Sequence, residues 1–287
     1  MQKINKKGEK KMEPTQRKII YIIISIFCVF AVLAAVVDQI SISSGSKNKI
    51  SSENTVEEEK QAQIKQDFNS MFDNTVHYNN YDTSSIKKQV VGKDIVYSVY
   101  DIEETKANKY EVDIHLPLIN IDNDVASSFN STTQEVFANK ATEVLNNTGD
   151  TAIIYSVNYT GFVSGDILSV ILKSTLKEPE NPQRVIVKTY NYNLKTNKEV
   201  SILDAIKQKG TTQDVVKDKI KVQIVNAIQE AKSIEASGYG TYSRDINSSI
   251  YNLENVSEFF FKDDGTLYIV YAYGNSNYTS ELDIIKI

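Results

Sequence analysis

Few residues in this chain are of types suited to catalysis or metal binding. It has two histidines, His77 and His115, and one cysteine, Cys28, so neither a His-x-x-x-His pair nor a cysteine pair of a zinc site occurs. The sequence also lacks a Gly-x-Ser-x-Gly nucleophile turn, a phosphate loop and a Gly-x-Gly-x-x-Gly motif. We therefore expect no metal and no cofactor, and we interpret His115 as a half-exposed residue on a strand.

Paired carboxylates are the one arrangement here that could hydrolyse a cell-wall glycan. That reaction needs only two carboxyl groups, whose separation is set by folding rather than by sequence spacing. Glu111 and Asp113 share one face of a predicted strand, and Asp263 and Asp264 precede Gly265. Charges on a strand face are commonly solvated and Asp-Asp-Gly is a hairpin-turn sequence, so both pairs have simpler explanations. We predict a protein that is not an enzyme.

Tyrosines are the better candidates for ligand binding. The chain has 17 of them, and four lie close together near the C-terminus: Tyr268, Tyr271, Tyr273 and Tyr278. On a strand Tyr271 and Tyr273 share a face, and amphipathic rings near acidic groups suit a basic protein or a sugar. These four residues are the predicted ligand-binding site. The alternative is that several of the rings pack on a sheet with their hydroxyls in water.

The charge is distributed unevenly along the chain. The formal net charge is −5, but residues 1–18 hold seven basic and two acidic side chains, so the segment from Asp38 onward carries −10. An acidic domain of this kind repels nucleic acid and attracts cationic partners. Nucleic-acid binding is therefore not expected, and a cationic protein is the first partner to consider.

Nineteen consecutive uncharged residues, Ile19 through Val37, follow the basic stub. At about 1.5 Å per residue they would extend about 28 Å as a helix, close to the hydrocarbon thickness of a bilayer. The positive-inside rule places the stub, residues 1–18, in the cytoplasm. The sequence thus predicts a single-pass protein of the cell membrane with a transmembrane helix over 19–37 and its C-terminal domain outside.

A cleaved signal peptide and a lipoprotein anchor on Cys28 are the alternatives for this segment. The apolar run is longer than the 7–15 residues typical of a signal peptide, and it lacks a clean Ala-x-Ala cleavage site. Phe27 precedes Cys28 where a lipoprotein needs a small residue. Met12 is an alternative start, because Gly8–Lys11 is what a ribosome-binding site would encode if translated in frame.

Residues 38–80 are predicted to form a stalk and a juxtamembrane helix. Ser41–Thr55 consists mostly of Ser, Asn, Lys and Gly, which is typical of a flexible linker. A helix is expected from Glu57, because apolar residues then recur at positions i, i+4, i+7 and i+8. They are Ile64, Phe68, Met71 and Phe72.

Residues 81–150 are predicted to form a first α+β subdomain. Alternating patterns in Ile95–Tyr100 and Tyr110–Leu116 indicate a hairpin whose second strand ends at Pro117. A helix with one apolar face follows, over 125–145, and we expect Asp122 or Asp124 to cap it.

Residues 151–287 are predicted to form a C-terminal α+β domain. The expected elements are strands over Ala152–Phe162, Asp166–Thr175 and Arg184–Leu194, a helical turn over Ser201–Ile206, a long helix from Thr212 or Asp214, a hairpin of Ser257–Lys262 and Thr266–Tyr273, and a last strand over Glu281–Ile287. The expected fold class is therefore α+β: an N-terminal transmembrane helix, then an antiparallel sheet with helices packed on it.

Three segments resemble the exported domain of the RsiV-like proteins: Asp166–Val170, Tyr190–Ile206 and Phe259–Tyr271. In that family a strand with Leu-Ser, a strand-turn-helix and a final hairpin recur at these places. Lys109–Leu145 resembles the companion domain that precedes it, so the resemblance covers about Ile95 to Ile287.

The chain also departs from the family pattern. Lys177–Val185 is rich in Pro and Glu where a Gly-Gly-Ala-His-type segment is common, and Tyr271–Asn275 replaces a Tyr-Glu-Ile-x-Pro element. Asn197 stands at the usual turn glycine, which is chemically reasonable because Asn tolerates positive φ.

The resemblance implies a function at the cell envelope. The family includes a membrane-bound anti-sigma factor whose outer domain receives lysozyme, and relatives that carry a peptidoglycan deacetylase domain. This chain has no deacetylase module, and its stub is too short to hold a sigma factor. We expect a non-catalytic, extracytoplasmic ligand-binding or sensing domain in a Gram-positive envelope, with a cationic protein such as lysozyme as ligand. The alternatives are a glycan-binding or scaffolding module of the cell wall and a peptidoglycan-acting enzyme.

Overall fold

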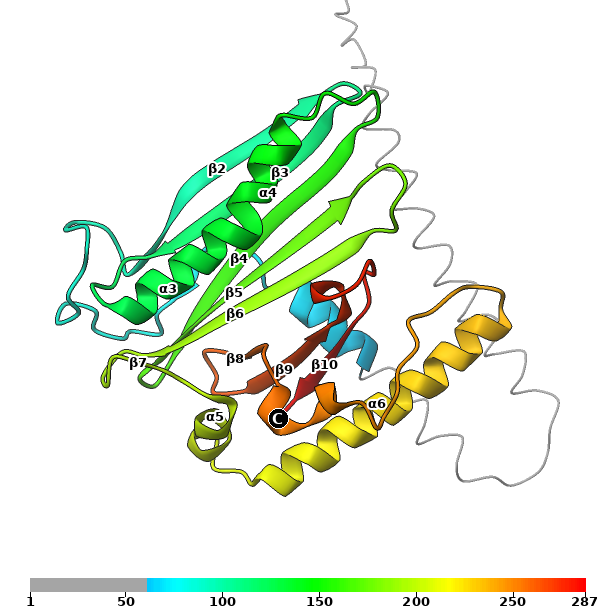
Figure 1. Cartoon of the computed structure of the whole chain (residues 1–287). Coiled ribbons are helices and arrows are strands. Elements are labelled where there is room, and N and C mark those ends of the chain that lie inside the picture. The colour runs from blue at the N-terminus through cyan, green and yellow to red at the C-terminus, as the bar shows by residue number, and fades with distance from the viewer. Residues whose placement is uncertain (1–60) are drawn as a thin grey trace, which may run out of the picture. The chain divides into compact units, whose positions relative to one another are not determined.

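A mixed sheet of seven strands carries the fold in this computed structural model, which describes residues 61–287 (Figure 1). Six strands lie in the order β2-β3-β4-β5-β6-β7, and the short β1 pairs with β4 beyond the end of β3. The strands are β1 (Val76–His77), β2 (Val96–Lys106), β3 (Tyr110–Ile119), β4 (Ile153–Ser164), β5 (Ile167–Lys177), β6 (Arg184–Asn193) and β7 (Lys198–Glu199). The meander β4-β5-β6 is antiparallel, as the sequence predicted.

The hairpin expected in the first part of the chain is present as β2 and β3. Asn108 takes a positive φ of 59° in its turn, a conformation that Asn adopts more readily than most residues. The prediction that Pro117 ends the second strand is wrong, because β3 continues to Ile119. Pro117 pairs with Ser98 next to an irregularity in register, and proline is tolerated at such bulges.

A helical crossover joins β3 to β4, which run parallel. It consists of α3 (Asp124–Thr133), a π-helical turn (Gln134–Ala138) and α4 (Asn139–Leu145), and it covers one face of the sheet (Figure 1). The side chain that caps α3 is Asn123, rather than Asp122 or Asp124: its amide oxygen accepts a hydrogen bond from Ala126 N at 2.9 Å.

Strands from both sides of residue 150, the predicted boundary between two subdomains, pair in the same sheet. Residue 150 lies in the connection from α4 to β4, and Tyr110–Ile114 of β3 pairs with Ile153–Val157 of β4. All the described residues, 61–287, belong to one compact unit.

Among the described residues there is also a smaller, three-stranded antiparallel sheet, which packs against the other face of β5 and β6 (Figure 1). Two helices cover its far side, and Ser201 and Thr212 cap their N-termini. The elements are α5 (Ile202–Gln208), α6 (Gln213–Ala236), β8 (Phe259–Phe261), β9 (Leu267–Ala272) and β10 (Leu282–Lys286), with 3-10 turns at Ser249–Tyr251, Leu253–Asn255 and Tyr273–Asn275.

Three apolar clusters result from this stacking of helix, sheet, sheet and helix. The first lies between α3–α4 and the large sheet, and the third lies between the small sheet and α5–α6. The middle cluster, which we call the inter-sheet core, includes Ile171 and Val187 of the large sheet and Phe260 of the small one. A helix over residues 61–69 adds Ile64 and Phe68 to it, as its apolar stripe predicts.

Two parts of the expected fold need correction. The large sheet is mixed rather than antiparallel, because the helical crossover brings β4 parallel to β3 and β1 also pairs parallel with β4. The α+β class with helices packed on a sheet is confirmed, but the transmembrane helix is not retained, because no helix among residues 61–287 is long and apolar enough to cross a membrane. The segment predicted to span the membrane, 19–37, and the predicted stub and stalk over 1–18 and 41–55 lie outside the described residues.

Candidate functional site

One half of the large sheet has a face that no described element covers. Pleating alternates the side chains of β2 to β5, so one set faces α3 and α4 and the other set faces away. The small sheet covers this second set only at β5, β6 and the end of β4. We call the uncovered remainder the open face; it consists of Asp101, Glu103, Thr105, Glu111, Asp113, His115, Ile154, Ser156, Asn158 and Lys177. Lys173 and Thr175 belong to the same set but lie against the helix over 61–69 and the chain that enters β10.

The open face is acidic on β2 and β3. Glu103 of β2 lies directly opposite Asp113 of β3. Glu111 lies two residues before Asp113 on β3, on the same face. Like charges in directly opposed positions destabilise a sheet. Glu103 and Glu111 are exposed and form no ion pair within residues 61–287. The fold thus keeps a repulsive group of carboxylates at its surface.

His115 offsets part of this repulsion. Its Nδ1 lies 2.8 Å from Asp101 Oδ1 and its Nε2 lies 3.0 Å from Asp113 Oδ1. Both ring nitrogens face carboxylate oxygens, so both donate hydrogen bonds, which only the charged imidazolium can do. Partial burial disfavours that charge, but the hydrogen bonds to Asp101 and Asp113 outweigh it and raise the pKa of His115.

We expect the His115 ring to titrate above its ordinary pKa of about 6.5 in an NMR titration. Asp101→Asn and Asp113→Asn should each lower that pKa. Because the folded-state pKa is raised, the stabilisation is complete below about pH 6.5 and is lost as the pH rises through the folded-state value. The side chains of Asp101 and Asp113 are 57% and 48% exposed, so each pair is worth only about 0.2–1 kcal/mol. An unchanged pKa in the double variant would rule out this source of the shift.

The four predicted tyrosines do not form one surface. Tyr268 lies in the inter-sheet core, stacked on Phe260 with 4.9 Å between ring centroids. Tyr271 of β9 and Tyr273, which begins the 3-10 turn after that strand, are both buried in the cluster on the α5–α6 side. Tyr278 is 48% exposed, and its ring lies 5.4 Å from the guanidinium carbon of Arg184. Only Tyr278 therefore presents its ring to a ligand in this structure.

The carboxylate pairs considered for glycan hydrolysis lie in different surroundings. Glu111 and Asp113 are part of the open face, where His115 lies 3.0 Å from Asp113. Asp264 shapes the β8–β9 turn, since its Oδ1 accepts a hydrogen bond from Thr266 N at 2.8 Å beside Gly265 at φ 78°. No group of three or more His, Cys, Asp or Glu side chains suited to a metal ion occurs among the residues that the structure describes.

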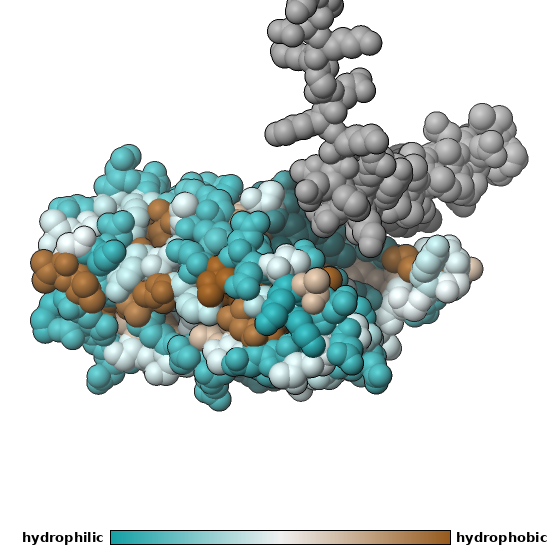
Figure 2. Space-filling model, turned by 90° about the horizontal axis from the view of Figure 1, so that it is seen from above, coloured by the Kyte–Doolittle hydropathy of each residue, from teal (hydrophilic) through white to brown (hydrophobic). Residues whose placement is uncertain are grey.

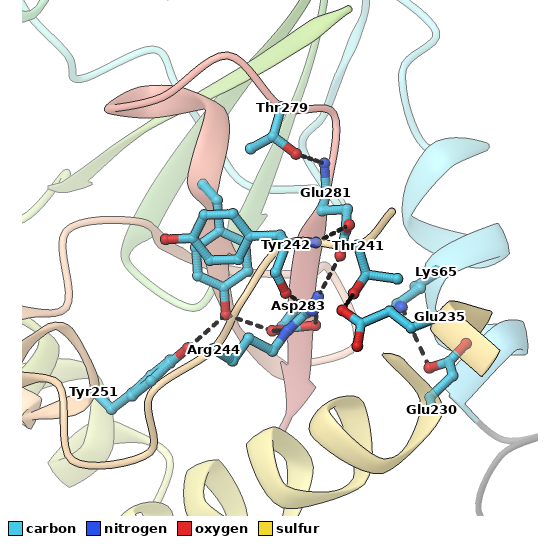
Figure 3. Close-up of polar contacts among 11 residues, drawn as sticks. Lys65, Glu230, Glu235, Thr241, Tyr242, Arg244, Tyr251, Thr279, Glu281 and Asp283 are labelled. Atoms are coloured by element: carbon cyan, nitrogen blue, oxygen red, sulfur yellow. Dashed lines mark hydrogen bonds and ion pairs between the residues drawn. The ribbon is translucent and has the colours of Figure 1, made fainter. Parts of the chain in front are cut away.

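A buried charge cluster below the small sheet was not predicted from the sequence (Figure 3). Arg244 comes from the segment after α6, and its side chain is 4% exposed. Its Nε lies 2.7 Å from Asp283 Oδ2 and one terminal nitrogen lies 3.1 Å from Asp283 Oδ1, a two-point contact with a fully buried carboxylate. The hydroxyl of Tyr273 also donates a hydrogen bond to Asp283 Oδ2. The same hydroxyl lies 2.8 Å from the hydroxyl of Tyr251.

This cluster joins the segment after α6 to β10. Burial and the nearby Asp283 carboxylate raise the pKa of Tyr273, so its hydroxyl stays protonated and donates. The hydrogen bonds to Asp283 outweigh burial and raise the pKa of Arg244, so the guanidinium stays charged. All the charged groups are paired with one another, and the ion pair fixes the chain after α6 against β10.

Comparison with known proteins shows no family for this chain. No family model matches the chain, and no curated protein matches it. Similar solved structures include a DUF3298 family protein from Pseudomonas aeruginosa PAO1, with 11% identity, a TM-score of 0.36, and coverage of 67% of this chain and 86% of that one. Another, from Bacteroides fragilis NCTC 9343, has 12% identity, a TM-score of 0.33, and coverage of 62% and 80%. Both of these structures are of DUF3298 family proteins.

Proposed function

We propose that residues 61–287 form a non-catalytic, RsiV-like ligand-binding domain whose ligand is a cationic protein of the lysozyme type. The single observation that carries the proposal is the acidic part of the open face, on β2 and β3. The sequence resemblance to the RsiV-like proteins supports both the ligand class and a place outside the cytoplasm at the cell envelope. Protease added to intact cells tests this location, because a domain outside the cytoplasm should be digested.

A cationic partner would relieve a repulsion that the isolated domain cannot remove. Glu103, Glu111 and Asp113 lie next to one another across two strands, and His115 pairs with only one of them. Lysine or arginine side chains of a partner would place positive charge between these carboxylates. The domain's excess of negative charge would also speed the encounter by long-range attraction.

The character of the surface fits a partner recognised by charge. The open face presents carboxylate, amide and hydroxyl groups, with Ile154, 44% exposed, as its one large apolar side chain. In the view of Figure 2, hydrophobic residues likewise form small separate patches among hydrophilic ones. Binding through such a surface depends on ionic strength, because salt screens exposed charges beyond about 10 Å at 0.1 M.

Association of the full-length protein with lysozyme tests the proposal. We expect measurable binding at about 0.05 M salt and at least tenfold weaker binding at about 0.3 M, measured by biolayer interferometry. An acidic protein of similar size is the control and should not bind. Absence of binding, or binding that salt does not weaken, would contradict the proposal, and retention on purified peptidoglycan instead would favour the glycan-binding module.

A further inference from the structure

A polar hollow lies at the junction of the two sheets and the helix over 61–69. Its volume is about 440 Å³. It is lined from the helix by Lys65 and Asn69, from β5 by Lys173 and Thr175, and from the chain entering β10 by Ser280 and Glu281; Gln183, Val185, Arg244 and Leu282 complete it. Its walls are mainly polar, and its charged side chains are three cations and one anion.

Lys173 is the central group of this hollow. Its Nζ donates a hydrogen bond to Asn69 Oδ1 at 2.9 Å and lies 4.5 Å from the centroid of the Phe72 ring. Among residues 61–287 no carboxylate lies within ion-pair distance of it. Burial without a counter-charge disfavours the ammonium ion and lowers the pKa of Lys173. The fold therefore places a half-buried amine in the hollow without neutralising it.

Lys65 adds a second amine, whose positive charge is only weakly offset by a carboxylate. Its contact with Glu230 of α6 is 3.9 Å long, and both side chains are partly exposed, at 32% and 49% (Figure 3). Glu281, the one acid of the lining, is already engaged: one carboxylate oxygen lies 2.9 Å from Arg244 and the other accepts a hydrogen bond from Tyr242 N. Arg244 is in turn held by Asp283, so the two lysines are the cations left for a ligand.

Neutral hydrogen-bonding groups surround these amines. The Thr175 and Ser280 hydroxyls and the Gln183 amide line the hollow, and their side chains make no hydrogen bond to another described residue. Amines together with free hydroxyl and amide donors suit a group with several charged oxygens, since hydrogen bonds from charged donors to such oxygens are about twice as strong as neutral ones.

We propose that this hollow is a binding site for an anionic oxygen-bearing group, a carboxylate or a phosphate, of a small polar ligand. Lys173 and Lys65 supply the charge, and Thr175, Gln183 and Ser280 supply hydrogen bonds. The site is separate from the proposed recognition of a cationic protein. Lys173 of β5 stands opposite Asn158 of β4, two strands away from the acidic residues of β3 on the open face.

Titration of the full-length protein with inorganic phosphate and, separately, acetate tests the site. We expect at least one of them to shift the side-chain NMR signals of Lys173 with a saturable curve at millimolar concentration, and chloride at equal ionic strength not to do so. Because Lys173→Met lacks that side-chain signal, binding by the variants is followed through the backbone amide signals of Thr175 and Ser280, which line the same hollow. Lys173→Met and Lys65→Met should each weaken binding at least tenfold, whereas Lys195→Met, which replaces an exposed lysine in the β6–β7 turn, should leave it unchanged. A response to phosphate alone or to acetate alone identifies the oxyanion.

Two results would overturn the site: no shift with either anion up to about 50 mM, or equal binding by the wild-type chain and both lysine variants. Lys65→Met keeps the test valid if Lys173→Met fails to fold. Lysozyme binding by the lysine variants should stay within twofold of wild type, so that failure of one proposal is distinguishable from failure of the other.

Discussion

Replacing Arg244 with methionine should lower the free energy of unfolding by about 3–5 kcal/mol. The substitution keeps most of the side-chain volume but removes the partner of Asp283, which is fully buried. A buried carboxylate without a counter-charge is strongly destabilising, whereas the hydroxyl of Tyr273 supplies only one hydrogen bond. Urea denaturation of the full-length chain, followed by the tyrosine signal, measures the change.

A double variant separates the ion pair from the rest of the cluster. Arg244→Met combined with Asp283→Asn removes both charges, so it should recover a large part of the stability that the single variant loses. Lys195→Met, which removes an exposed cation, is the control and should change stability by less than about 0.5 kcal/mol. A loss below about 1 kcal/mol in Arg244→Met would show that the pair does not hold the chain after α6.

Charge reversal on the open face should weaken lysozyme binding about 10–100-fold, or about 1.4–2.8 kcal/mol. The variant combines Glu103→Lys with Glu111→Lys, both exposed positions. Stability should not fall, since a lysine at position 103 would face Asp113 and replace a repulsive pair by an attractive one. The expected loss is therefore specific to binding.

The matched control is Glu135→Lys combined with Glu254→Lys. These exposed carboxylates lie in the π-helical turn and in a 3-10 turn before β8, so the control changes the net charge by the same amount elsewhere. Binding should fall at most about threefold in the control, through the loss of long-range attraction. Equal losses in both variants would mean that net charge, and not the open face, determines binding.

Local signals in the sequence predicted most of the individual elements. Period-2 alternation located the hairpin β2–β3 and the meander β4-β5-β6, and the pattern after Thr212 located α6. Turn chemistry was also informative: Asn197, expected to tolerate a positive φ at the turn, has φ 58°. Such signals depend on a few neighbouring residues, so a sequence alone carries them.

Arrangements that depend on distant residues were not predicted. Parallel pairing of β3 with β4 is decided by how the crossover packs on the sheet, and it creates the open face. Burial of Tyr268, Tyr271 and Tyr273 follows from the small sheet being covered on both faces, whereas the sequence shows only a cluster of aromatic residues. Arg244 and Asp283 are 39 residues apart, and no local pattern connects them.

Carboxyl footprinting tests the central claim most directly. The full-length protein is treated with a carbodiimide and an amine label, with and without lysozyme, and the modification of each acidic residue is measured by mass spectrometry. We predict that lysozyme protects Glu103 and Glu111 from modification and leaves Glu135 and Glu254 unprotected. Protection confined to other carboxylates, with Glu103 and Glu111 labelled equally in both samples, would contradict the assignment of the open face as the ligand-binding surface.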